Sequence, residues 1–334
     1  MARYLLTGGA GFIGSHLANR LSLMGKKVSI LDAMRCYAHP PAAETRAVDR
    51  HCRHALIASS ELLHEDIANR ERLLRVLERL QPDCIVHLAA NPILSSAERD
   101  PVGCRTDILE TTRALVEAVR LSGGVRRFVH LSSSMVYGDF EDGLAAEDAP
   151  VAPVNAYGRL KLESEDLVVS ILSDTSTDWS IVRPMAVYGA GDFYRRVIPL
   201  FCAQAEAGEQ LSLRAGADMR IDFTHVEDVV DGLIRVAMEP AARGRIFNIS
   251  CGEARSLLDL AGILQAHFPR LRYELLQDRD VRRPSRGALN IDKARRLLGY
   301  SPNVRLEDGI AAYLSHLASG NAGPSRSRLA GEVA

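Results

Sequence analysis

A glycine-rich turn between a short apolar strand and a helical segment constrains the fold of this 334-residue chain more than any other feature. The strand spans Arg3 to Thr7, glycines follow at positions 8, 11 and 14, and helical periodicity runs from Ser15 to Met24. Glycines at these places allow a tight turn, close approach of the backbone to a pyrophosphate and close helix packing, and the helix N-terminus attracts the anion. Glycines also serve plain turns, and the spacing G-x-x-G-x-x-G differs from the usual G-x-G-x-x-G. The flanking strand and helix nevertheless predict a dinucleotide site.

The second predicted strand, Lys27 to Leu31, ends in Asp32, eighteen residues beyond the last glycine of the turn. A carboxylate at this place accepts hydrogen bonds from both ribose hydroxyls of a dinucleotide and repels a 2′-phosphate. The position therefore favours NAD over NADP. Arg35 lies close enough in the sequence to keep NADP as an alternative.

Strand and helix patterns continue to alternate through the first half of the chain. They occur at 69–80, 84–90, 107–122 and 127–131. This βαβ order is typical of a doubly wound parallel sheet with helices on both faces, the Rossmann architecture of the α/β class. The arginine-containing segment 37–61 has weak periodicity, and we expect it to be a surface excursion.

From residue 190 onwards the alternation loosens, which indicates a second, smaller unit. We predict an NAD-binding domain at 1–183, with return strands near 221–250. Residues 184–318 would form mainly a substrate domain. The Gly-, Ser-, Ala- and Arg-rich tail at 319–334 is predicted to be disordered.

The composition argues against several classes of function. A net charge of −1 gives no electrostatic reason to expect nucleic acid or an anionic membrane as a partner. The six cysteines lack C-x-x-C spacing, and the histidines and cysteines between residues 36 and 54 are too irregularly placed for a metal site. No signal peptide precedes the first strand, and no apolar run approaches about 18 residues. We therefore expect a cytoplasmic protein without a membrane span or a metal.

Tyr157 and Lys161 stand four residues apart at the start of a helical pattern, so they share one helix face. A phenol with an unperturbed pKa of about 10 is a poor base, but a nearby cation favours the phenolate. The pair therefore predicts a device for proton transfer, and the alternative is an exposed Tyr and Lys on a solvated face. The chain has four lysines and nine tyrosines, so this spacing arises by chance only about one time in ten, which favours the functional interpretation.

Three serines, Ser132 to Ser134, directly follow the predicted strand 127–131. Ligands of open parallel sheets bind at the carboxyl ends of the strands. A hydrogen-bonding role for these serines is therefore favoured over a plain polar turn.

The order of the motifs resembles that of the extended short-chain dehydrogenase/reductases, and most of all their nucleotide-sugar epimerase/dehydratase branch. The motifs are Thr7-Gly8-Gly9-Ala10-Gly11-Phe12-Ile13-Gly14-Ser15-His16, His87-Leu88-Ala89-Ala90, Leu131-Ser132-Ser133-Ser134-Met135-Val136-Tyr137-Gly138 and Tyr157-x-x-x-Lys161. The resemblance covers residues 2–318, and the conjunction is specific although each motif alone is common.

This resemblance implies NAD as the cofactor and suggests roles for individual residues. The cofactor would be held by Gly8, Gly11, Phe12, Ile13, Gly14, Asp32, Asp66, Ile67, Leu88, Ala89, Ala90, Tyr157, Lys161 and Pro184. Tyr157 would be the catalytic acid and base. Lys161 would bind the nicotinamide ribose and lower the Tyr157 pKa, and Ser133 would hydrogen-bond the reacting oxygen. The substrate-binding residues would be Ser133, Ser134, Arg220 and Arg283, with the two arginines on the diphosphate.

Departures from the family pattern narrow the function. The 4,6-dehydratases carry Asp-Glu where this chain has Ser134 and Met135, and the sugar-acid decarboxylases carry Glu at the Met135 position. Asparagine is usual at the places of Asp107 and Ala186, which leaves the fine geometry of the substrate site open. Arg286 replaces an acid that often follows the Arg-Pro pair, and this extra cation would suit a carboxylated sugar such as a uronic acid.

The resemblance predicts an epimerase that uses tightly held NAD and inverts C4 of a UDP-hexose or UDP-hexuronic acid through a transient keto-sugar. The alternative is an NAD(P)H-dependent reductase of a nucleotide-linked keto-sugar. A non-catalytic dinucleotide sensor on the same fold is a third hypothesis, which the intact Tyr157 and Lys161 disfavour. We also expect a homodimer, provided that one apolar row after Tyr157 is exposed rather than directed into the core. The row consists of Leu167, Val168, Ile171 and Leu172.

Overall fold

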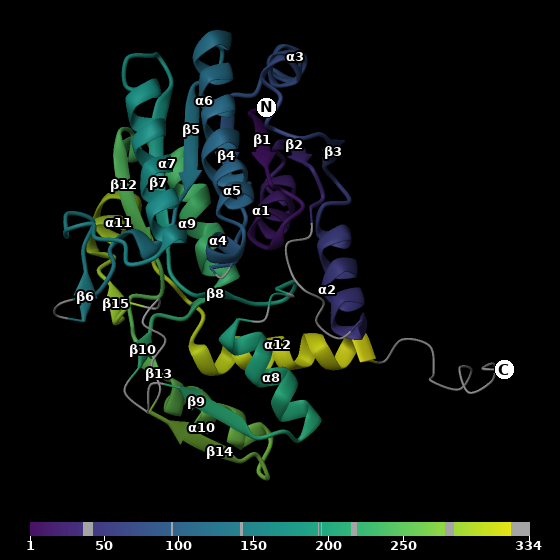
Figure 1. Ribbon diagram of the computed structural model, residues 1–334. Helices are drawn as coiled ribbons and strands as arrows, with labels where there is room; N and C mark the ends of the chain where they lie inside the picture. The colour runs from purple at the N-terminus through teal and green to yellow at the C-terminus, as the bar shows by residue number, and fades with distance from the viewer. Residues whose placement is uncertain are drawn as a thin grey trace, which may run out of the picture.

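A seven-stranded parallel sheet forms the centre of the molecule, with the strand order β12-β7-β5-β4-β1-β2-β3 (Figure 1). The computed structural model describes residues 1–35, 43–94, 96–140, 143–192, 194, 196–214, 219–277 and 284–321. The strands are β1 (Arg3–Thr7), β2 (Lys27–Asp32), β3 (Glu61–His64), β4 (Cys84–His87), β5 (Arg127–Leu131), β7 (Asp178–Pro184) and β12 (Arg245–Ile249). The order reverses direction between β1 and β4, as in other doubly wound sheets, and the predicted fold class is confirmed.

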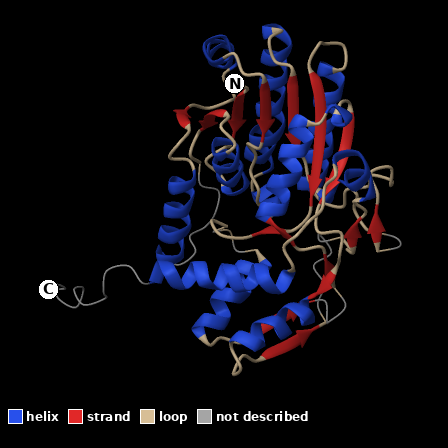
Figure 2. Ribbon diagram, turned by 180° about the vertical axis from the view of Figure 1, so that it is seen from behind, coloured by secondary structure: helices blue, strands red, loops and turns tan. Residues whose placement is uncertain are grey.

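Helices cover both faces of this sheet (Figure 2). One face carries α3 (Arg70–Leu80), α6 (Thr111–Ser122) and α7 (Ala156–Leu172), and the other carries α1 (Phe12–Leu23), α9 (Val226–Met238) and α11 (Asp292–Leu298). Alternate residues of each strand enter opposite cores, so Leu5 and Ile85 pack toward α6, whereas Leu6 and Val86 pack toward α1. Burial on both faces explains why consecutive residues in the middle of the central strands are apolar, such as Ile85-Val86 and Phe128-Val129.

A smaller lobe with its own apolar core lies beyond the carboxyl ends of the strands (Figure 1). It contains α8 (Val197–Ala207), β9 (Leu211–Arg214), α10 (Leu257–His267), β14 (Tyr273–Leu276) and α12 (Leu306–Asn321). Between these elements the chain returns to the sheet as α9 and β12. Short paired strands connect the two parts: β8 (Val187–Tyr188) with β11 (Thr224–His225), β10 (Arg220–Ile221) with β13 (Arg255–Ser256), and β6 (Leu144–Ala145) with β15 (Ala288–Leu289).

The expected surface excursion at 37–61 is wrong in part, because it contains the helix α2 (Ala43–Leu56) and the first residue of β3. Arg53 and Ile57 are buried, and Ile57 joins the core around α1. Alanine accounts for six of the eleven apolar residues of this segment, so the sequence shows only weak periodicity. Three of the four β3 residues are exposed at the sheet edge, which removes the usual apolar signal of a strand.

The apolar row on α7 packs inside the molecule, so of the two directions that the sequence left open the structure shows the one into the core. Val168 and Leu172 are fully buried between α7, α6 and the sheet, and Leu167 and Ile171 are partly buried against other apolar side chains. The row therefore offers no free dimer surface, and the homodimer stays a prediction.

Two further expectations concern parts of the chain that are described incompletely. Helix α12 continues to Asn321, so residues 319–321 of the expected tail are helical, and 322–334 lie outside the described residues. Cys36 and His39 of the scattered His/Cys group also lie outside them. Among the residues that are described, no three His, Cys, Asp or Glu side chains are grouped to hold a metal ion. The described helices include none with the length and apolar character needed to cross a membrane.

Asp222, which lies between β10 and β11, connects the lobe to the sheet. Its side chain is fully buried and accepts hydrogen bonds from three different segments. The donors are the hydroxyls of Thr224 and Ser250 and the backbone N–H groups of Cys251, Gly252 and Leu289, at 2.7 to 3.2 Å. A single carboxylate thereby satisfies buried donors that the surrounding loops cannot satisfy themselves.

We expect Asp222→Ala to lower the free energy of unfolding by about 3 kcal/mol or more, because several buried donors lose their acceptor at once. Asp231→Ala is the matched control, since Asp231 lies on α9 in a partly exposed pair with Arg235 and should change stability by less than about 1 kcal/mol. Urea unfolding of both variants measures the difference. Equal stabilities would show that Asp222 does not hold these segments together.

Candidate active site

A cavity of about 1400 Å³ opens at the carboxyl ends of the strands and continues to the lobe. Single small-molecule sites occupy roughly 300–1000 Å³, so this volume accommodates a dinucleotide and a second ligand. Of the predicted site residues, those that line it are Gly8, Gly11, Phe12, Ile13, Gly14, Asp32, Asp66, Ile67, Leu88, Ala89, Ala90, Ser133, Ser134, Tyr157, Lys161 and Pro184. The structure thus brings together residues from seven separate parts of the sequence.

At the glycine turn, backbone atoms of neighbouring segments lie in close contact, which leaves no room for side chains. A Cβ on Gly8 would lie 2.6 Å from the Ala89 nitrogen, and Gly8 also has a positive φ of 71°. A Cβ on Gly14 would lie 2.6 Å from the Gly8 carbonyl oxygen. The first turn of α1 carries no acidic side chain, and Gly11 at its N-cap provides no side-chain acceptor. The free N–H groups at this helix end therefore face the cavity as an anion site, and the turn fits a dinucleotide pyrophosphate.

Asp32 fixes the turn to the end of β2. Its carboxylate accepts from the backbone N–H of Ala10 at 3.0 Å and from that of Met34 at 2.7 Å, and it faces the cavity. Arg35 is directed to Asp66 and Asp107, at 2.5 Å from the latter. The Arg35 guanidinium, which could bind the 2′-phosphate of NADP, is therefore paired with two carboxylates. This arrangement agrees with NAD as the cofactor.

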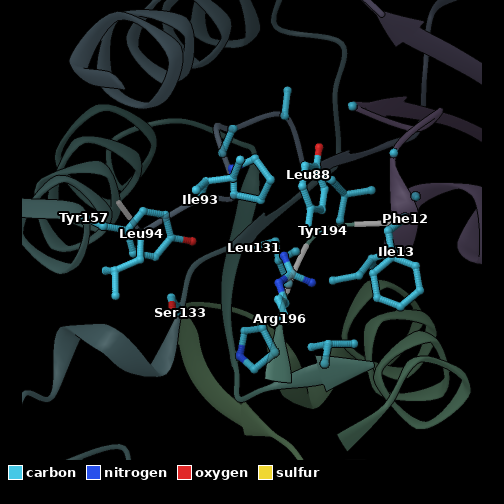
Figure 3. A pocket seen from close by; sticks show the side chains of 18 of the residues that line it. Phe12, Ile13, Leu88, Ile93, Leu94, Leu131, Ser133, Tyr157, Tyr194 and Arg196 are labelled. Atoms are coloured by element: carbon cyan, nitrogen blue, oxygen red, sulfur yellow. The ribbon is translucent and has the colours of Figure 1, made fainter. Parts of the chain in front are cut away.

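Tyr157 and Ser133 lie on one side of the cavity, opposite Phe12 and Ile13, with Tyr194 and Arg196 between them (Figure 3). Burial raises the pKa of the Tyr157 phenol to about 12, and the nearby Arg196 charge and Ser133 hydroxyl oppose this rise. Ser133 also caps the short 3-10 turn Ser134–Val136 by accepting from the Met135 N–H at 3.2 Å. This bond fixes the Ser133 hydroxyl beside the phenol.

Lys161 is buried one helical turn beyond Tyr157. Its ammonium donates to the Leu131 carbonyl at 2.9 Å, and desolvation lowers its pKa to about 8, although the Glu165 carboxylate opposes the shift. Two buried histidines lie nearby, and desolvation followed by the Lys161 charge lowers the pKa of His87 to about 3 and that of His130 well below its ordinary value. Both histidines are therefore neutral, and Lys161 carries the positive charge at this depth.

The helix that carries Tyr157 and Lys161 is held by a buried ion pair one turn further along. Glu165 accepts from Arg183 on β7 at 2.9 and 2.5 Å, and also from the Ser132 hydroxyl at the end of β5. Asn155 caps the helix by accepting from the Gly158 N–H at 2.8 Å. The ion pair thereby fixes this helix to the sheet edge, and the Asn155 cap determines where the helix begins.

Arg286, which precedes β15 in the chain, contacts the last residue of the serine segment 132–134. Its guanidinium donates to the Ser134 hydroxyl at 2.8 Å, contacts the Met135 sulfur and lies 5.6 Å from the centre of the Phe140 ring. The family's dehydratases carry two acids where Ser134 and Met135 stand. This chain places a cation there instead.

The two arginines predicted for the diphosphate differ from the other site residues. Arg220 is exposed, donates to the Ala254 carbonyl at 3.4 Å and does not line the cavity, whereas its neighbours Met219 and Ile221 do. Side chains alternate along a strand, so the neighbours' inward direction turns Arg220 outward. The prediction for Arg220 is therefore not supported. Arg283 lies outside the described residues.

Several cavity residues were missed by the sequence analysis. They are Arg50, Arg53 and His54 from α2, Tyr194 and Arg196 from the segment before α8, and Arg214 from β9. No motif contains them, and single arginines give little signal in a chain this rich in arginine. Arg53 donates to the Gly191 carbonyl at 2.7 Å and so connects α2 to the segment that carries Tyr194.

Ala186 and Asp107, which depart from the family pattern, both lie at irregular backbone. Ala186 has a positive φ of 38°, a conformation that asparagine and glycine tolerate better than alanine. Asp107 lies in the π-helical turn Thr106–Glu110, where burial raises its pKa and the Arg35 charge opposes this.

Comparison with known proteins gives a family. The profile of the NAD dependent epimerase/dehydratase family matches residues 4–250. The chain belongs to this family. It is therefore an enzyme of the NAD-dependent epimerase kind, as predicted, and its cofactor is NAD, in agreement with the glycine turn and Asp32.

Three members show how far the similarity extends. The UDP-glucose 4-epimerase of Mycolicibacterium smegmatis is 33% identical over 92% of this chain and 96% of its own length. The dTDP-L-rhamnose 4-epimerase of Burkholderia thailandensis is 28% identical over 92% of this chain and 93% of its own. The crystal structure of UDP-glucuronic acid 4-epimerase from Bacillus cereus, in complex with UDP-glucuronic acid and NAD, superposes with a TM-score of 0.85. It is 26% identical and covers 95% of this chain and 99% of its own.

We expect Gly14→Ala to remove most of the NAD that co-purifies with the protein, because the added Cβ would collide with the Gly8 carbonyl in the cradle. Gly262→Ala on α10 is the matched control, because a Cβ there meets no other atom within 4 Å. NAD released by denaturation and the melting temperature are measured for both. A Gly14→Ala protein that retains a full complement of NAD would contradict this account of the turn.

Proposed function

We propose that this chain is an NAD-dependent nucleotide-sugar 4-epimerase that acts on a UDP-hexose or UDP-hexuronic acid. The observation that carries the proposal is the placing of Tyr157 and Ser133 beside the dinucleotide cradle, with no acid at Ser134 and Met135. The names of the similar proteins from M. smegmatis and B. cereus support a 4-epimerase and a UDP-sugar.

Each step of the proposed reaction uses a residue of this cavity. Deprotonated Tyr157 would take the proton of the C4 hydroxyl, and Ser133 would donate a hydrogen bond to the reacting oxygen. The Arg196 charge and the Ser133 hydroxyl favour this deprotonated form, against the burial that raises the Tyr157 pKa to about 12. NAD, when bound, supplies the acceptor for the hydride of C4 and returns it. Lys161 would hold the nicotinamide ribose, while Gly8, Gly11, Gly14 and Asp32 would hold the rest of the cofactor. Tyr157 then gives the proton back after the sugar has turned over.

Other reactions of the family fit this cavity less well. A 4,6-dehydratase must protonate a departing C6 hydroxyl and remove the C5 proton, and neither Met135 nor the Arg286 cation beside it can do so. A keto-sugar reductase needs a reduced cofactor that is replaced after each turnover, whereas the proposed epimerase uses the same bound NAD again. The cytoplasmic location and the homodimer stay predictions.

The proposal predicts turnover without any added cofactor. The purified protein is incubated with UDP-, dTDP- and GDP-sugars, including uronic acids, and each reaction is followed by proton NMR. Appearance of the C4 epimer from either direction, with NAD only as purified, is the expected result. Reaction of a keto-sugar only when NADH or NADPH is supplied would point to the reductase instead.

Tyr157→Phe should lower kcat by about 10²- to 10⁴-fold while the protein keeps its NAD, because the phenyl ring fills the same space but carries no proton. Tyr273→Phe, at an exposed position on β14, is the control and should be fully active. Initial rates and bound NAD are measured on the same preparations. Unchanged activity in Tyr157→Phe would rule out this acid and base and would revive the sensor hypothesis.

A further inference from the structure

Arg35 connects three parts of the chain at the cofactor end of the cavity. One of its terminal nitrogens donates to the Asp107 carboxylate at 2.5 Å, and the other donates to the Asp66 carboxylate. Arg35 follows β2, Asp66 follows β3, and Asp107 lies in the π-helical turn Thr106–Glu110. All three residues line the cavity together with Asp32. The guanidinium therefore bridges two carboxylates, three residues beyond the one that would hold the adenosine ribose.

The turn after β2 directs Arg35 into this bridge. Asp32 accepts from the Met34 backbone N–H at 2.7 Å, and Met34 has a positive φ of 54°. A residue other than glycine adopts this conformation at a cost, so the surrounding contacts must stabilise it. The contacts on either side of Met34 are the Asp32 bond and the two ion pairs of Arg35. The direction of the Arg35 side chain is therefore part of the local fold.

Asp107 is the more buried of the two partners. Its side chain is 10% exposed, against 40% for Asp66. Burial raises the Asp107 pKa, and the Arg35 charge opposes this rise. Two charges that are shielded from water attract each other more strongly, and salt screens them less. Asp107 is therefore the partner that holds Arg35 more firmly.

The 2′-phosphate of NADP would be attached to the ribose at Asp32, close to Arg35 in the chain. An arginine commonly accommodates this phosphate, because its planar fork of donors matches the phosphate oxygens. Both terminal nitrogens of Arg35 already donate to carboxylates. A phosphate would have to displace Asp107 or Asp66 and leave that carboxylate without its cation. Binding of NADP therefore carries a cost beyond repulsion by Asp32.

We infer that Asp107 is a second determinant of cofactor choice, which excludes NADP by holding Arg35 away from the 2′-phosphate. Asp107 is a positioning residue in this arrangement, since it acts on the cofactor through Arg35. Cofactor choice does not depend on which sugar is converted, so the proposed 4-epimerase reaction can fail without this selection failing.

The test is competition between the two cofactors for the purified protein. The NAD-containing protein is incubated with equal concentrations of NAD and NADP, both in large excess, until the bound fractions no longer change. Unbound cofactor is removed, and the cofactors released by denaturation are quantified. In the wild type, bound NADP should be at most about one hundredth of bound NAD. Asp107→Asn should raise this ratio about 10-fold or more, because one acceptor of Arg35 loses its charge. Asparagine is usual at this position in the family, so we expect the variant to fold.

Arg35→Gln and the double variant separate an effect through Arg35 from direct repulsion. Arg35→Gln should not raise the ratio. In that background Asp107→Asn should raise it by less than about 3-fold, since no guanidinium remains to bind the phosphate. Glu110→Gln is the matched control, because it removes one carboxylate from the same π-helical turn but only from exposed ion pairs with Arg105 and Arg113. It should leave the ratio unchanged.

Several outcomes would overturn the inference. An unchanged ratio in Asp107→Asn, or an equal rise in Glu110→Gln, would mean that Asp107 has no specific effect. An equal rise with and without Arg35 would mean that Asp107 repels the phosphate directly. A wild type that binds NADP as well as NAD, or an Asp107→Asn protein that retains neither cofactor, would also contradict it. Sugar conversion is measured separately by proton NMR, so its absence alongside the expected ratios would refute the proposed reaction alone.

Discussion

The buried ion pair between Glu165 and Arg183 determines where the chemistry of this protein can take place. Both side chains are 3% exposed, and the carboxylate accepts two bonds from the guanidinium and one from Ser132. Burying two charges is expensive, and it is tolerated where the geometry is good and the remaining lone pairs are satisfied. Glu165 lies on the same face of α7 as Lys161 and Tyr157, because the three residues are spaced by four. The contacts of Glu165 with Ser132, at the end of β5, and with Arg183 on β7 therefore place Tyr157 and Lys161 at the carboxyl ends of the strands.

Burial has opposite effects on the two groups that this helix presents. It raises the pKa of Tyr157 to about 12 and lowers that of Lys161 to about 8, so desolvation alone favours the uncharged form of both. The opposing influences come from outside the pair: Arg196 and Ser133 act on the phenol, and Glu165 acts on the ammonium. Arg196 belongs to the segment that leads into the lobe. The protonation of Tyr157 thus depends in part on a residue of this connecting segment.

The cavity combines a part built from backbone with a part built from side chains. At the cofactor end, the glycine turn and Asp32 create the cradle, and their geometry depends on residues close together in the chain. At the other end, Ser134, Met135 and Arg286 come from segments about 150 residues apart. One fold can carry different chemistries when side chains at one end of its cavity differ, as Ser134 and Met135 differ from the two acids of the dehydratases.

The sequence by itself determined the parallel sheet, the cofactor and most of the cavity lining, because these depend on short-range spacing. Glycines at positions 8, 11 and 14 and a tyrosine four residues before a lysine have the same meaning wherever the remainder of the chain lies. Only the tertiary structure showed that Arg220 turns away from the cavity, since a strand of two residues carries no periodicity that reveals its inner face. The same holds for the apolar row on α7, whose pattern fits a core and an interface equally well. Arg196 and Arg286 enter the site through contacts between segments far apart in the sequence, and no local pattern distinguishes such arginines from those at the surface.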